Sequence, residues 1–374
     1  MKKIKILLIA FFTFLFASNL IADHKEPRIA VRQAKDFAQL SQTGLLQKRF
    51  KVNFDVFGEI PNEKMTSKDN PKFNKLFKDK FNLAAIVFKN DEIIYERYNK
   101  KRGFDSNFPM QGMSMSKTAA AAAIGSLLCD GRIKSLDDIA GSYSETLNDS
   151  PYKNIKIKDI LQMNSGVSPL GRVNEREIVF MGRQIGQYEN DGGIRKSVNF
   201  YNSASRSPGS GMNYHPTDSF ALSVLVKDIA GESAAKVFYK NVLSKAADNP
   251  YMQWTADKEG LTITYGDLTM TPRTWLDFGK YILSNIQNKT CLGNFFIDGI
   301  NNAISDTREK IKEKYGYHFW VYEIDGIPSV VLKGHYGHIM SINHNDGEIL
   351  LLHSSNSHYK SGKVMDVERY AEEI

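Results

Sequence analysis

The sequence predicts an α+β fold, in which an antiparallel sheet is flanked by helices and a mostly helical subdomain is inserted into the chain. Strand-like segments occur towards both ends of the 374 residues, and helical segments occupy the middle. The composition, with 42% hydrophobic and 24% charged residues, is that of a globular protein. Internal repeats and low-complexity stretches are absent from the sequence, which excludes solenoids, propellers and disordered chains.

The start of the chain has the pattern of a secretory signal. Three lysines occur among the first five residues, and an almost wholly apolar run follows at 6–16. That run is shorter than the roughly 20 residues that a membrane-spanning helix needs. We therefore expect residues 1–22 to be a signal peptide cleaved after Ala22, and the mature protein to be periplasmic or secreted without a stable membrane span. An uncleaved membrane anchor is the alternative.

The charge of the chain gives no reason to expect a nucleic-acid partner. The formal net charge is +7, and removing the three lysines of residues 1–22 lowers it to +4. The remaining basic residues are spread along the chain without a Lys/Arg block. We expect a small-molecule partner, and the oligomeric state stays open.

The two cysteines, Cys129 and Cys291, are too few for a disulfide framework or a cysteine-based metal site. Export would make a disulfide chemically possible. Cys129 falls within an apolar helical pattern, however, and this favours a buried thiol that packs as a small hydrophobic side chain.

The first regular elements are a hairpin and an alanine-rich helix. The β-prone runs 82–88 and 92–98 flank Lys89-Asn90-Asp91, a hairpin-type connection. The segment 105–112 resembles a loop and leads into a helix over 114–129, which contains five consecutive alanines. Small side chains let neighbouring elements approach closely on all sides, so we expect this helix to be central and its first turn to be rigid.

The rest of the chain divides into helices followed by strands. We expect helices at 157–163, 219–230, 234–243, 274–286 and 364–373, and strands at 318–324, 329–332, 338–343 and 348–354. The N-terminal hairpin and the C-terminal strands can then form one sheet. This predicts a sheet subdomain of residues 23–140 plus 255–374 and a helical subdomain of residues 141–254, with a substrate cleft between them.

Ser114 and Lys117 form an S-x-x-K arrangement at the start of the alanine-rich helix. Residues i and i+3 lie on the same helical face, so the hydroxyl and the amine can reach hydrogen-bonding distance. The partial positive charge of a helix N-terminus stabilises developing negative charge on the serine oxygen. The same field and burial disfavour the ammonium form of the lysine, which leaves an amine that can act as a base. Alone, the motif is weak, because it occurs by chance.

A Ser-His-Asp triad is the alternative chemistry at this position. Residues 112–116, Gly-Met-Ser-Met-Ser, miss the G-x-S-x-G nucleophile elbow by their last residue. The elbow also requires a buried strand before the serine, whereas 108–111 is expected to be a loop. The sequence has no His-Gly-Gly motif for an oxyanion hole.

Two segments carry a resemblance to a known family. Residues 114–140, SMSKTAAAAAIGSLLCDGRIKSLDDIA, and 155–167, IKIKDILQMNSGV, are similar in order, spacing and residue type to motifs of the serine β-lactamase and penicillin-binding superfamily. From about residue 82 to 355 the chain resembles its class C-like branch, which includes family VIII carboxylesterases and 6-aminohexanoate-dimer hydrolases. The resemblance implies the β-lactamase-like fold.

The resemblance also implies the roles of three residues. Ser114 would be the acylating nucleophile and Lys117 its partner. The family's Tyr-x-Asn or Tyr-x-Ser element begins 17 residues before a glycine that ends a helix, and Tyr214 has this spacing from Gly231. Tyr214 would therefore exchange protons with the serine and the lysine. The third position of the element is Pro216, which has no side-chain amide to hold a β-lactam substituent.

The family's Lys-Thr-Gly element has a counterpart that departs from the motif. His335 stands in the place of the lysine, Tyr336 in that of the threonine, and Gly337 matches the glycine. The resemblance implies that these residues contact substrate and that the backbone N–H of His338 joins that of Ser114 in an oxyanion hole.

Lys333 lies two residues before His335 and is the alternative source of a cation on this strand. Asp137-Asp138 fits a turn of the family and is expected to cap a helix, not to form a pair of catalytic acids. The remaining histidines are too scattered in sequence for a metal site, and we expect neither a metal nor another cofactor.

The function expected from these residues is acyl transfer to water in two steps, through an acyl-enzyme on Ser114. The absence of the Tyr-x-Asn amide and of Lys-Thr-Gly favours a small ester or amide as the substrate. Activity as a β-lactamase or D,D-peptidase is the first alternative. A penicillin-recognising or degenerate protein that binds without turnover is the second.

Overall fold

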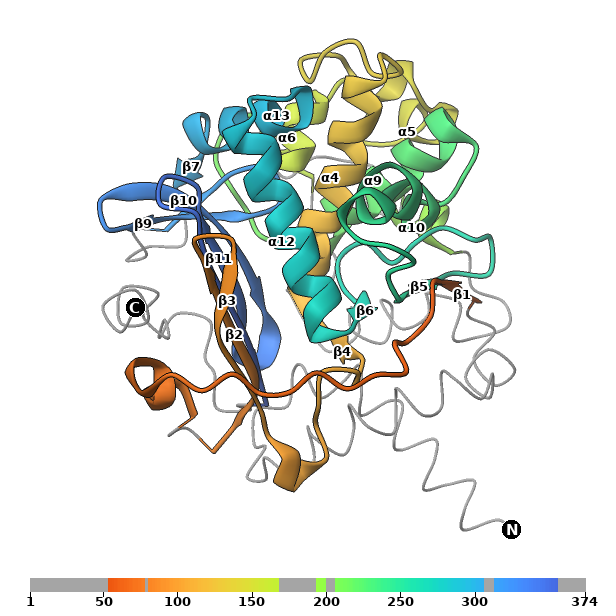
Figure 1. Cartoon of the computed structure of the whole chain (residues 1–374). Helices are drawn as coiled ribbons and strands as arrows, with labels where there is room; N and C mark the ends of the chain where they lie inside the picture. Colours follow the sequence, from red (N-terminus) through yellow and green to blue (C-terminus); the bar gives the residue numbers. More distant parts are fainter. Residues whose placement is uncertain (1–52, 78–79, 168–192, 200–205, 306–312, 356–374) are drawn as a thin grey trace, which may run out of the picture.

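The computed structural model describes residues 53–77, 80–167, 193–199, 206–305 and 313–355. The predicted signal peptide, cleavage site and helix 364–373 lie outside this part. Two antiparallel sheets and a set of helices form the described fold, which confirms the predicted α+β class (Figure 1). No helix in these residues combines the length and the apolar character that crossing a membrane requires.

The larger sheet has eight strands in the order β3-β2-β12-β11-β10-β9-β8-β7, and every neighbouring pair is antiparallel. The pairing of β12 with β2 joins the N-terminal hairpin to the C-terminal strands, as the sequence predicts. Both residues of the hairpin turn, Asn90 and Asp91, have positive φ angles, which is typical of a two-residue type I′ turn. The strands are β2 (Asn82–Lys89), β3 (Glu92–Tyr98), β7 (Ile304–Ser305), β8 (Lys314–Tyr315), β9 (Trp320–Ile324), β10 (Ile327–Gly334), β11 (His338–Asn343) and β12 (Glu348–Ser354).

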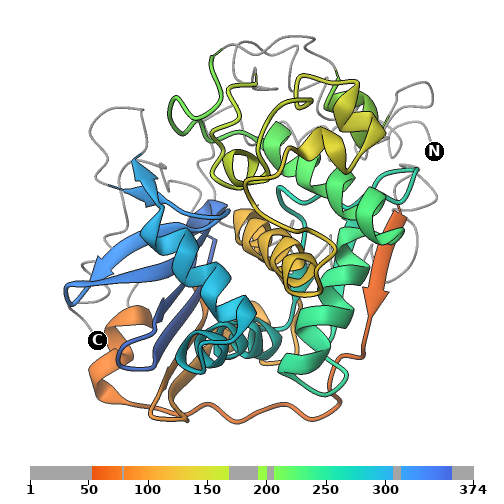
Figure 2. The ribbon, with the colours of Figure 1, turned by 90° about the horizontal axis from the view of Figure 1, so that it is seen from above.

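Helices cover one face of this sheet. Helix α12 (Pro272–Gln287) packs directly on β11 and β12, and α4 (Ser116–Cys129) lies beyond it, between α13 (Cys291–Asn301) on one side and α9 (Pro216–Ala230) with α10 (Ala234–Phe238) on the other. Figure 2 shows α4 end-on in the middle of this arrangement. The predicted central position of the alanine-rich helix is therefore observed.

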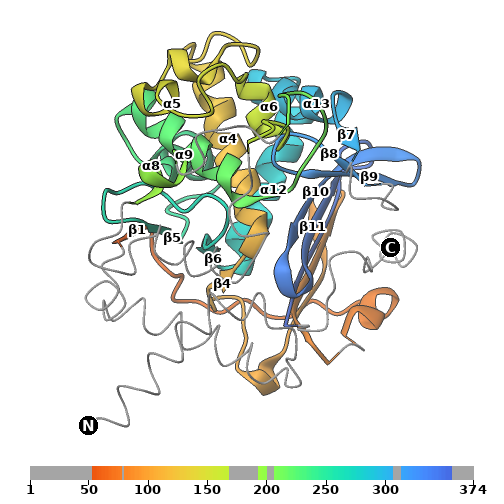
Figure 3. The ribbon, with the colours of Figure 1, turned by 180° about the vertical axis from the view of Figure 1, so that it is seen from behind.

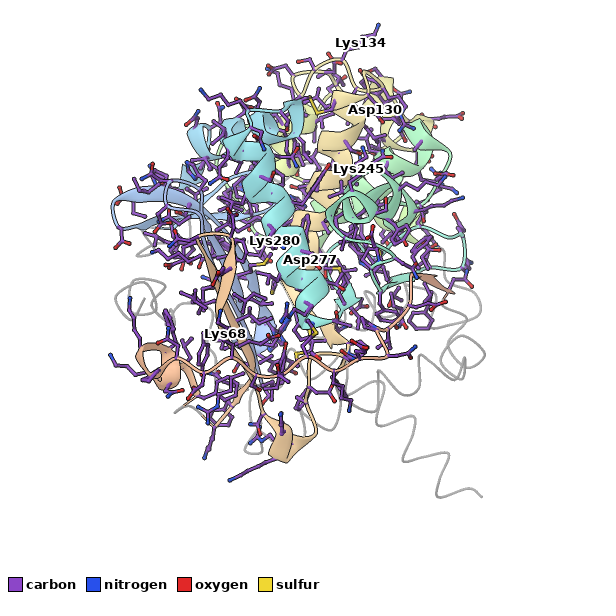
Figure 4. The ribbon with its side chains drawn as sticks, in the orientation of Figure 1. Lys68, Asp130, Lys134, Lys245, Asp277 and Lys280 are labelled. Carbon is purple, nitrogen blue, oxygen red and sulfur yellow. A yellow bond between two sulfur atoms is a disulfide. The ribbon has the colours of Figure 1, made fainter. Side chains whose placement is uncertain are left out.

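Helix α4 is buried because its side chains are small. Every residue from Ser116 to Leu127 is buried, and the five alanines are at most 1% exposed. Alanine has the highest intrinsic helix propensity, so the segment is helical without a polar face. Figure 4 shows Asp130 and Lys134 beyond the C-terminal end of α4, and Asp277 with Lys280 on α12.

The smaller sheet was not predicted from the sequence. Its four strands have the order β1-β5-β6-β4: β1 (Asn53–Phe57), β5 (Met252–Ala256), β6 (Thr269–Met270) and β4 (Met110–Gln111). Strands of two residues have no readable periodicity, and β1 falls in a segment that the sequence suggested was irregular. Figure 3 shows β4 and β6 near the start of α4, so this sheet supports the segment that precedes Ser114.

The expectation that Cys129 is a buried free thiol is wrong. Cys129 and Cys291 form a disulfide, with a Cα–Cα distance of 5.7 Å. Cys129 ends α4 and Cys291 begins α13, a helix that the sequence reading did not anticipate. The packing of α13 against α4 brings the two residues together, and a pattern within one helix cannot reveal such a contact.

The remaining described elements are short. Helix α6 lies within the helix predicted at 157–163. A π-helical turn continues α10 to Leu243, so that the two together cover the helix predicted at 234–243. The short elements are η1 (Pro71–Phe77), η2 (Lys100–Arg102), η3 (Met113–Met115), η4 (Ala140–Ser142), α5 (Glu145–Asn148), α6 (Ile157–Leu161), α8 (Ile194–Ser197), η5 (Tyr239–Leu243), α11 (Ser244–Ala246) and η6 (His335–Gly337). The subdomain boundaries at 140 and 255 stay a prediction.

Candidate active site

The start of α4 brings a serine hydroxyl and a lysine amine together. Ser114 lies in the turn η3 and is half-buried, whereas Lys117 lies in the first turn of α4 and is 3% exposed. The Nζ of Lys117 is 3.0 Å from the Oγ of Ser114 and also donates to the backbone oxygen of Tyr265 at 2.5 Å. The amine is therefore enclosed between two neutral oxygens, and no ion pair involves it within the part of the chain described.

The turn that carries Ser114 is held in an unusual backbone conformation. Met113 has a φ of +51°, in the left-handed region that costs a side-chain-bearing residue roughly 1–3 kcal/mol. A Cβ on Gly112 would lie 2.2 Å from the Cζ2 of Trp275, so only glycine permits this approach. The indole N–H of Trp275 donates to the backbone oxygen of Met110 at 3.1 Å. The tryptophan therefore fixes the chain immediately before the serine.

The segment around Leu268 fixes the other side of this turn. The N–H of Gly112 donates to the oxygen of Leu268 at 2.8 Å, and the N–H of Leu268 donates to the Oγ of Ser116 at 3.1 Å. The Oγ of Ser116 in turn donates to the oxygen of Met113 at 2.6 Å. These three hydrogen bonds hold the strained turn in place.

A buried histidine holds the first turn of α4 against two other helices. His318 is 1% exposed and has a φ of +58°; its backbone oxygen accepts from the Oγ1 of Thr118 at 3.0 Å. Its Nδ1 is 2.7 Å from the oxygen of Leu161 and its Nε2 is 3.0 Å from the Oγ of Ser219. Burial lowers the pKa of His318 to about 3. The ring is therefore neutral: Nδ1–H donates to the carbonyl, and Nε2 accepts from the hydroxyl.

Tyr214 lies against Lys117, as the resemblance implies. The Nζ of Lys117 is 4.9 Å from the centre of the Tyr214 ring, within the range of a cation–π contact for a protonated amine. The preceding segment is hydrogen-bonded to the end of α6: the N–H of Asn213 donates to the oxygen of Met163 at 2.8 Å, and the N–H of Gly211 to the Oδ1 of Asn164 at 2.7 Å. These bonds set the position of the half-buried tyrosine ring.

An aromatic wall extends from Tyr214 to the sheet. The Tyr214 ring stacks on Trp320 of β9, with ring centres 5.6 Å apart and an angle of 25°, and it meets Tyr315 edge-on at 5.7 Å. The Nζ of Lys333 also contacts Trp320, 4.9 Å from the ring centre. That Nζ forms an ion pair with Glu313 at 2.9 Å. Ring contacts of Tyr214 and Trp320 thus connect the positions of the Lys117 and Lys333 side chains.

The end of β10 approaches the turn that carries the serine. A Cβ on Gly334 would lie 2.4 Å from the oxygen of Gly112 and 3.2 Å from the Cβ of Met113, so the strand and the turn are in direct backbone contact. The tight turn η6 follows, in which Tyr336 has a φ of +67°. His338 then begins β11, opposite Gly334 in the ladder.

The side chain of His338 is buried away from solvent with a second histidine. Its Nδ1 is 3.1 Å from the Nδ1 of His353 and accepts from the N–H of Ser354 at 3.4 Å, so the proton between the two rings belongs to His353. Burial lowers the pKa of His338 to about 3 and that of His353 well below its usual range. Both rings are neutral, and any contribution of His338 to an oxyanion hole would come from its backbone N–H.

Two carboxyl groups near the site have raised pKa values. Burial raises the pKa of Asp267 to about 7, against the opposing charge of Lys117, and its Oδ1 accepts from the Nε2 of Gln111 at 2.5 Å. Asp267 also has a positive φ of +67°. Raised carboxyl pKa values and strained residues concentrate at functional sites.

The second carboxyl group, Asp218, lies in the first turn of α9 behind Tyr214. Burial raises its pKa to about 7, although the hydroxyls of Ser165 and Tyr152 donate to its Oδ1 at 2.6 and 2.7 Å. The Nε2 of His215 lies 3.7 Å from its Oδ2, and the charge of Asp159 raises the pKa further. This network joins the residue after Tyr214 to the helical layer.

The structure thus places Ser114, Lys117 and Tyr214 together. It places His335, Tyr336, Gly337 and His338 at the strand end beside the same turn, although their roles in binding or in an oxyanion hole stay predictions. Five further residues at or beside the candidate site were not predicted from the sequence: Tyr265, Asp267, His318, Trp320 and Glu313. Trp320 falls in the predicted strand 318–324 but was not assigned to the site, and strained or buried polar positions such as Asp267 have no local sequence signal.

The fold and this pair of side chains define a class of α+β proteins, in which a sheet and a helical layer enclose a serine and a lysine one helical turn apart. Residues 73–371 match the sequence model of the beta-lactamase family, and the chain therefore belongs to that family. Comparison with curated protein sequences gave no match.

Solved structures with the same fold include hydrolases of several kinds and penicillin-binding proteins. A Bacillus anthracis protein provisionally assigned as a 6-aminohexanoate-dimer hydrolase superimposes with a TM-score of 0.68 at 18% identity, over 89% of this chain and 92% of that one. A family VIII carboxylesterase superimposes with a TM-score of 0.59 at 12% identity, over 78% of this chain and 94% of that one. A D-stereospecific amidohydrolase from Streptomyces sp. superimposes with a TM-score of 0.57 at 14% identity, over 76% of this chain and 92% of that one. At these identities the likeness shows the fold, and the family supports a hydrolase.

Proposed function

We propose that the protein is an exported serine hydrolase that cleaves a small ester or amide through an acyl-enzyme on Ser114. The observation that carries this proposal is the 3.0 Å contact between the Nζ of Lys117 and the Oγ of Ser114, in a pocket of neutral partners beneath the Tyr214 ring. A serine hydroxyl becomes a nucleophile when an adjacent base can take its proton. The lysine amine is within the 2.6–3.2 Å range that such a transfer needs.

The reaction begins with attack of the Ser114 oxygen on the substrate carbonyl, while the proton passes to Lys117. The backbone N–H groups of Ser114 and His338 stabilise the oxyanion of the tetrahedral intermediate. Tyr214 delivers a proton to the leaving alcohol or amine, and the acyl-enzyme remains. Water then attacks the acyl group as the same residues accept and return the proton, which restores the serine.

The residues around this centre favour esters and small amides over β-lactams. Pro216, the first residue of α9, has no side-chain amide, and His335 replaces the lysine of Lys-Thr-Gly. Solved structures of the same fold include a carboxylesterase and an amidohydrolase. We propose export because of the basic and apolar start of the chain; the Cys129–Cys291 disulfide is consistent with an oxidising compartment.

A fluorophosphonate probe followed by peptide mapping tests the nucleophile directly. We expect the label on Ser114 in the wild type and no label in Ser114→Ala. Hydrolysis of p-nitrophenyl butyrate, nitrocefin, a D-Ala-D-Ala peptide and 6-aminohexanoate dimer by the same two proteins then ranks the substrates. Labelling of Ser165 or Ser210 in place of Ser114 would contradict the proposal, and a stable adduct without turnover would favour a penicillin-recognising binder.

A further inference from the structure

The Lys333–Glu313 pair is an enclosed ion pair at the end of the aromatic wall. The side chains of Lys333 and Glu313 are 13% and 8% exposed, and the Nζ–Oε1 distance is 2.9 Å. The ammonium also donates to the hydroxyl of Tyr322 and lies 4.9 and 5.0 Å from the ring centres of Trp320 and Tyr322. Two aromatic faces and one carboxylate therefore surround this cation.

The pair is connected to the candidate active site through two routes. Lys333 directly precedes Gly334, whose backbone touches Gly112 in the turn that carries the serine. Its ammonium also lies over Trp320, which stacks on Tyr214. The cation is thus on the strand whose end contacts the turn that carries the proposed nucleophile.

A cation at the end of such a strand attracts a substrate carboxylate, because two opposite charges in a partly desolvated site interact more strongly than in water. Here the chain supplies its own carboxylate. A substrate that carried a second one would have to displace Glu313 or place two negative charges side by side, which is unfavourable.

We propose that Glu313 is a specificity-determining residue, which occupies the Lys333 cation and restricts the site to esters or amides without a carboxylate near the scissile bond. This inference rests on the proposed hydrolase function and names its substrate class. It assigns the aromatic wall to the uncharged part of the substrate, since Tyr214 and Trp320 present ring faces there.

Two esters that differ only in a terminal carboxylate test the proposal. They are p-nitrophenyl butyrate, which is neutral, and mono-p-nitrophenyl glutarate, which is anionic. The wild type should prefer the neutral ester by at least tenfold in kcat/KM. In Glu313→Gln, which removes the negative charge beside the Lys333 ammonium, we expect this preference to fall tenfold or more, mainly through a lower KM for the glutarate ester.

The chain offers a matched control. Lys89 and Glu348 form a second ion pair on the larger sheet, at 2.7 Å, and the Glu348 side chain is 9% exposed. Glu348→Gln removes a comparably enclosed carboxylate and should leave the ratio of the two kcat/KM values as in the wild type. Glu313→Asp draws the carboxylate back without removing it, and should shift the ratio in the same direction as Glu313→Gln by a smaller factor. It keeps the test informative if Glu313→Gln does not fold.

A second measurement separates this inference from the proposed function. In proteins that also carry Ser114→Ala, Tm is followed against glutarate concentration at fixed ionic strength. We expect Tm to rise with glutarate concentration in Glu313→Gln, and by a smaller amount in Glu313→Asp. The protein that retains Glu313 and the Glu348→Gln protein should show no such rise. If the wild type cleaves neither ester, the proposed hydrolase function fails. The Tm response to glutarate then tests the role of Glu313 by itself. An unaltered substrate ratio, or a Tm response equal to that of the control, overturns the role of Glu313.

Discussion

Lys117 and Lys333 have similar surroundings except for one kind of partner. Each ammonium position is largely enclosed and lies over two aromatic rings, Tyr214 and Tyr265 for Lys117, and Trp320 and Tyr322 for Lys333. The Nζ of Lys117 contacts a hydroxyl and a carbonyl oxygen, whereas that of Lys333 contacts a carboxylate.

The difference shows how one fold can use the same side chain in two ways. A carboxylate partner stabilises the charged form of a lysine, whereas neutral oxygens in a desolvated pocket do so less. In the mechanism that we propose, Lys117 exchanges a proton with Ser114, whereas Lys333 stays paired with Glu313. The predictions below follow this contrast, from the largest expected effect on ester hydrolysis to the smallest.

Replacement of Lys117 by methionine should abolish most of the activity. The side chain keeps a similar length but loses its amine, so Ser114 has no adjacent base. We expect kcat/KM for p-nitrophenyl butyrate to fall by about 10³-fold or more, as for the loss of a general base. Steady-state kinetics measures the fall, and circular dichroism verifies the fold. A Lys117→Met protein with more than a tenth of the wild-type rate would remove the lysine from the mechanism.

Replacement of Tyr214 by phenylalanine should have an intermediate effect. The ring that stacks on Trp320 is retained, but the hydroxyl that we propose as the proton donor to the leaving group is lost. We expect kcat to fall by about 10²-fold with little change in KM. Tyr143→Phe removes a hydroxyl that bonds Asp138 at 2.6 Å, far along the chain from the serine, and serves as the control. Equal losses in the two variants would argue against a specific role for Tyr214.

Replacement of Lys333 by methionine should affect stability more than turnover. It leaves the Glu313 carboxylate enclosed and unpaired, and the loss of one partner of a buried ion pair costs about 3–5 kcal/mol. Urea unfolding should show this loss, while kcat/KM for the neutral ester falls by less than about tenfold. A rate loss as large as that of Lys117→Met would place both lysines in the same chemical role.

A similar contrast applies to the carboxyl groups, because Asp218 is buried and no lysine or arginine of the described residues forms an ion pair with it. Its pKa is raised to about 7, so between about pH 4 and pH 7 the folded state holds a proton that the unfolded state has released. The unfolding free energy should therefore fall as the pH rises through this window, with a slope of up to about 1.4 kcal/mol per pH unit. Asp267, whose pKa is also raised to about 7, titrates in the same window. Asp218→Asn should therefore reduce the slope without abolishing it, with only a small effect on turnover.

The measurement is urea unfolding at intervals from pH 4 to pH 8. Asp137→Asn is the control, because Asp137 is exposed and its pKa is lowered by Lys156. Its replacement should leave the fall between pH 4 and pH 7 in place. If Asp218→Asn shows the same slope as the wild type, Asp218 is not the group that takes up the proton.

Several features of the protein are determined by the sequence alone because they depend on neighbouring residues. The spacing of Ser114 and Lys117 places both on one face of a helix whatever lies around it, and the alanines after them predict that the helix is buried. Runs of β-prone residues predict the long strands, and those that flank Asn90-Asp91 predict the hairpin. The approach of Tyr214 to Lys117 was inferred only from the spacing of a family motif.

Only the tertiary structure decided which distant side chains meet at the site. The stack from Tyr214 through Trp320 to Lys333, the partner Glu313 and the Cys129–Cys291 bond each join elements that are far apart in the chain. Periodicity describes one face of one element, whereas these contacts depend on how several elements pack together. A pattern of residues can therefore predict the nucleophile and its base, but not the charge that the opposite wall of the site presents to a substrate.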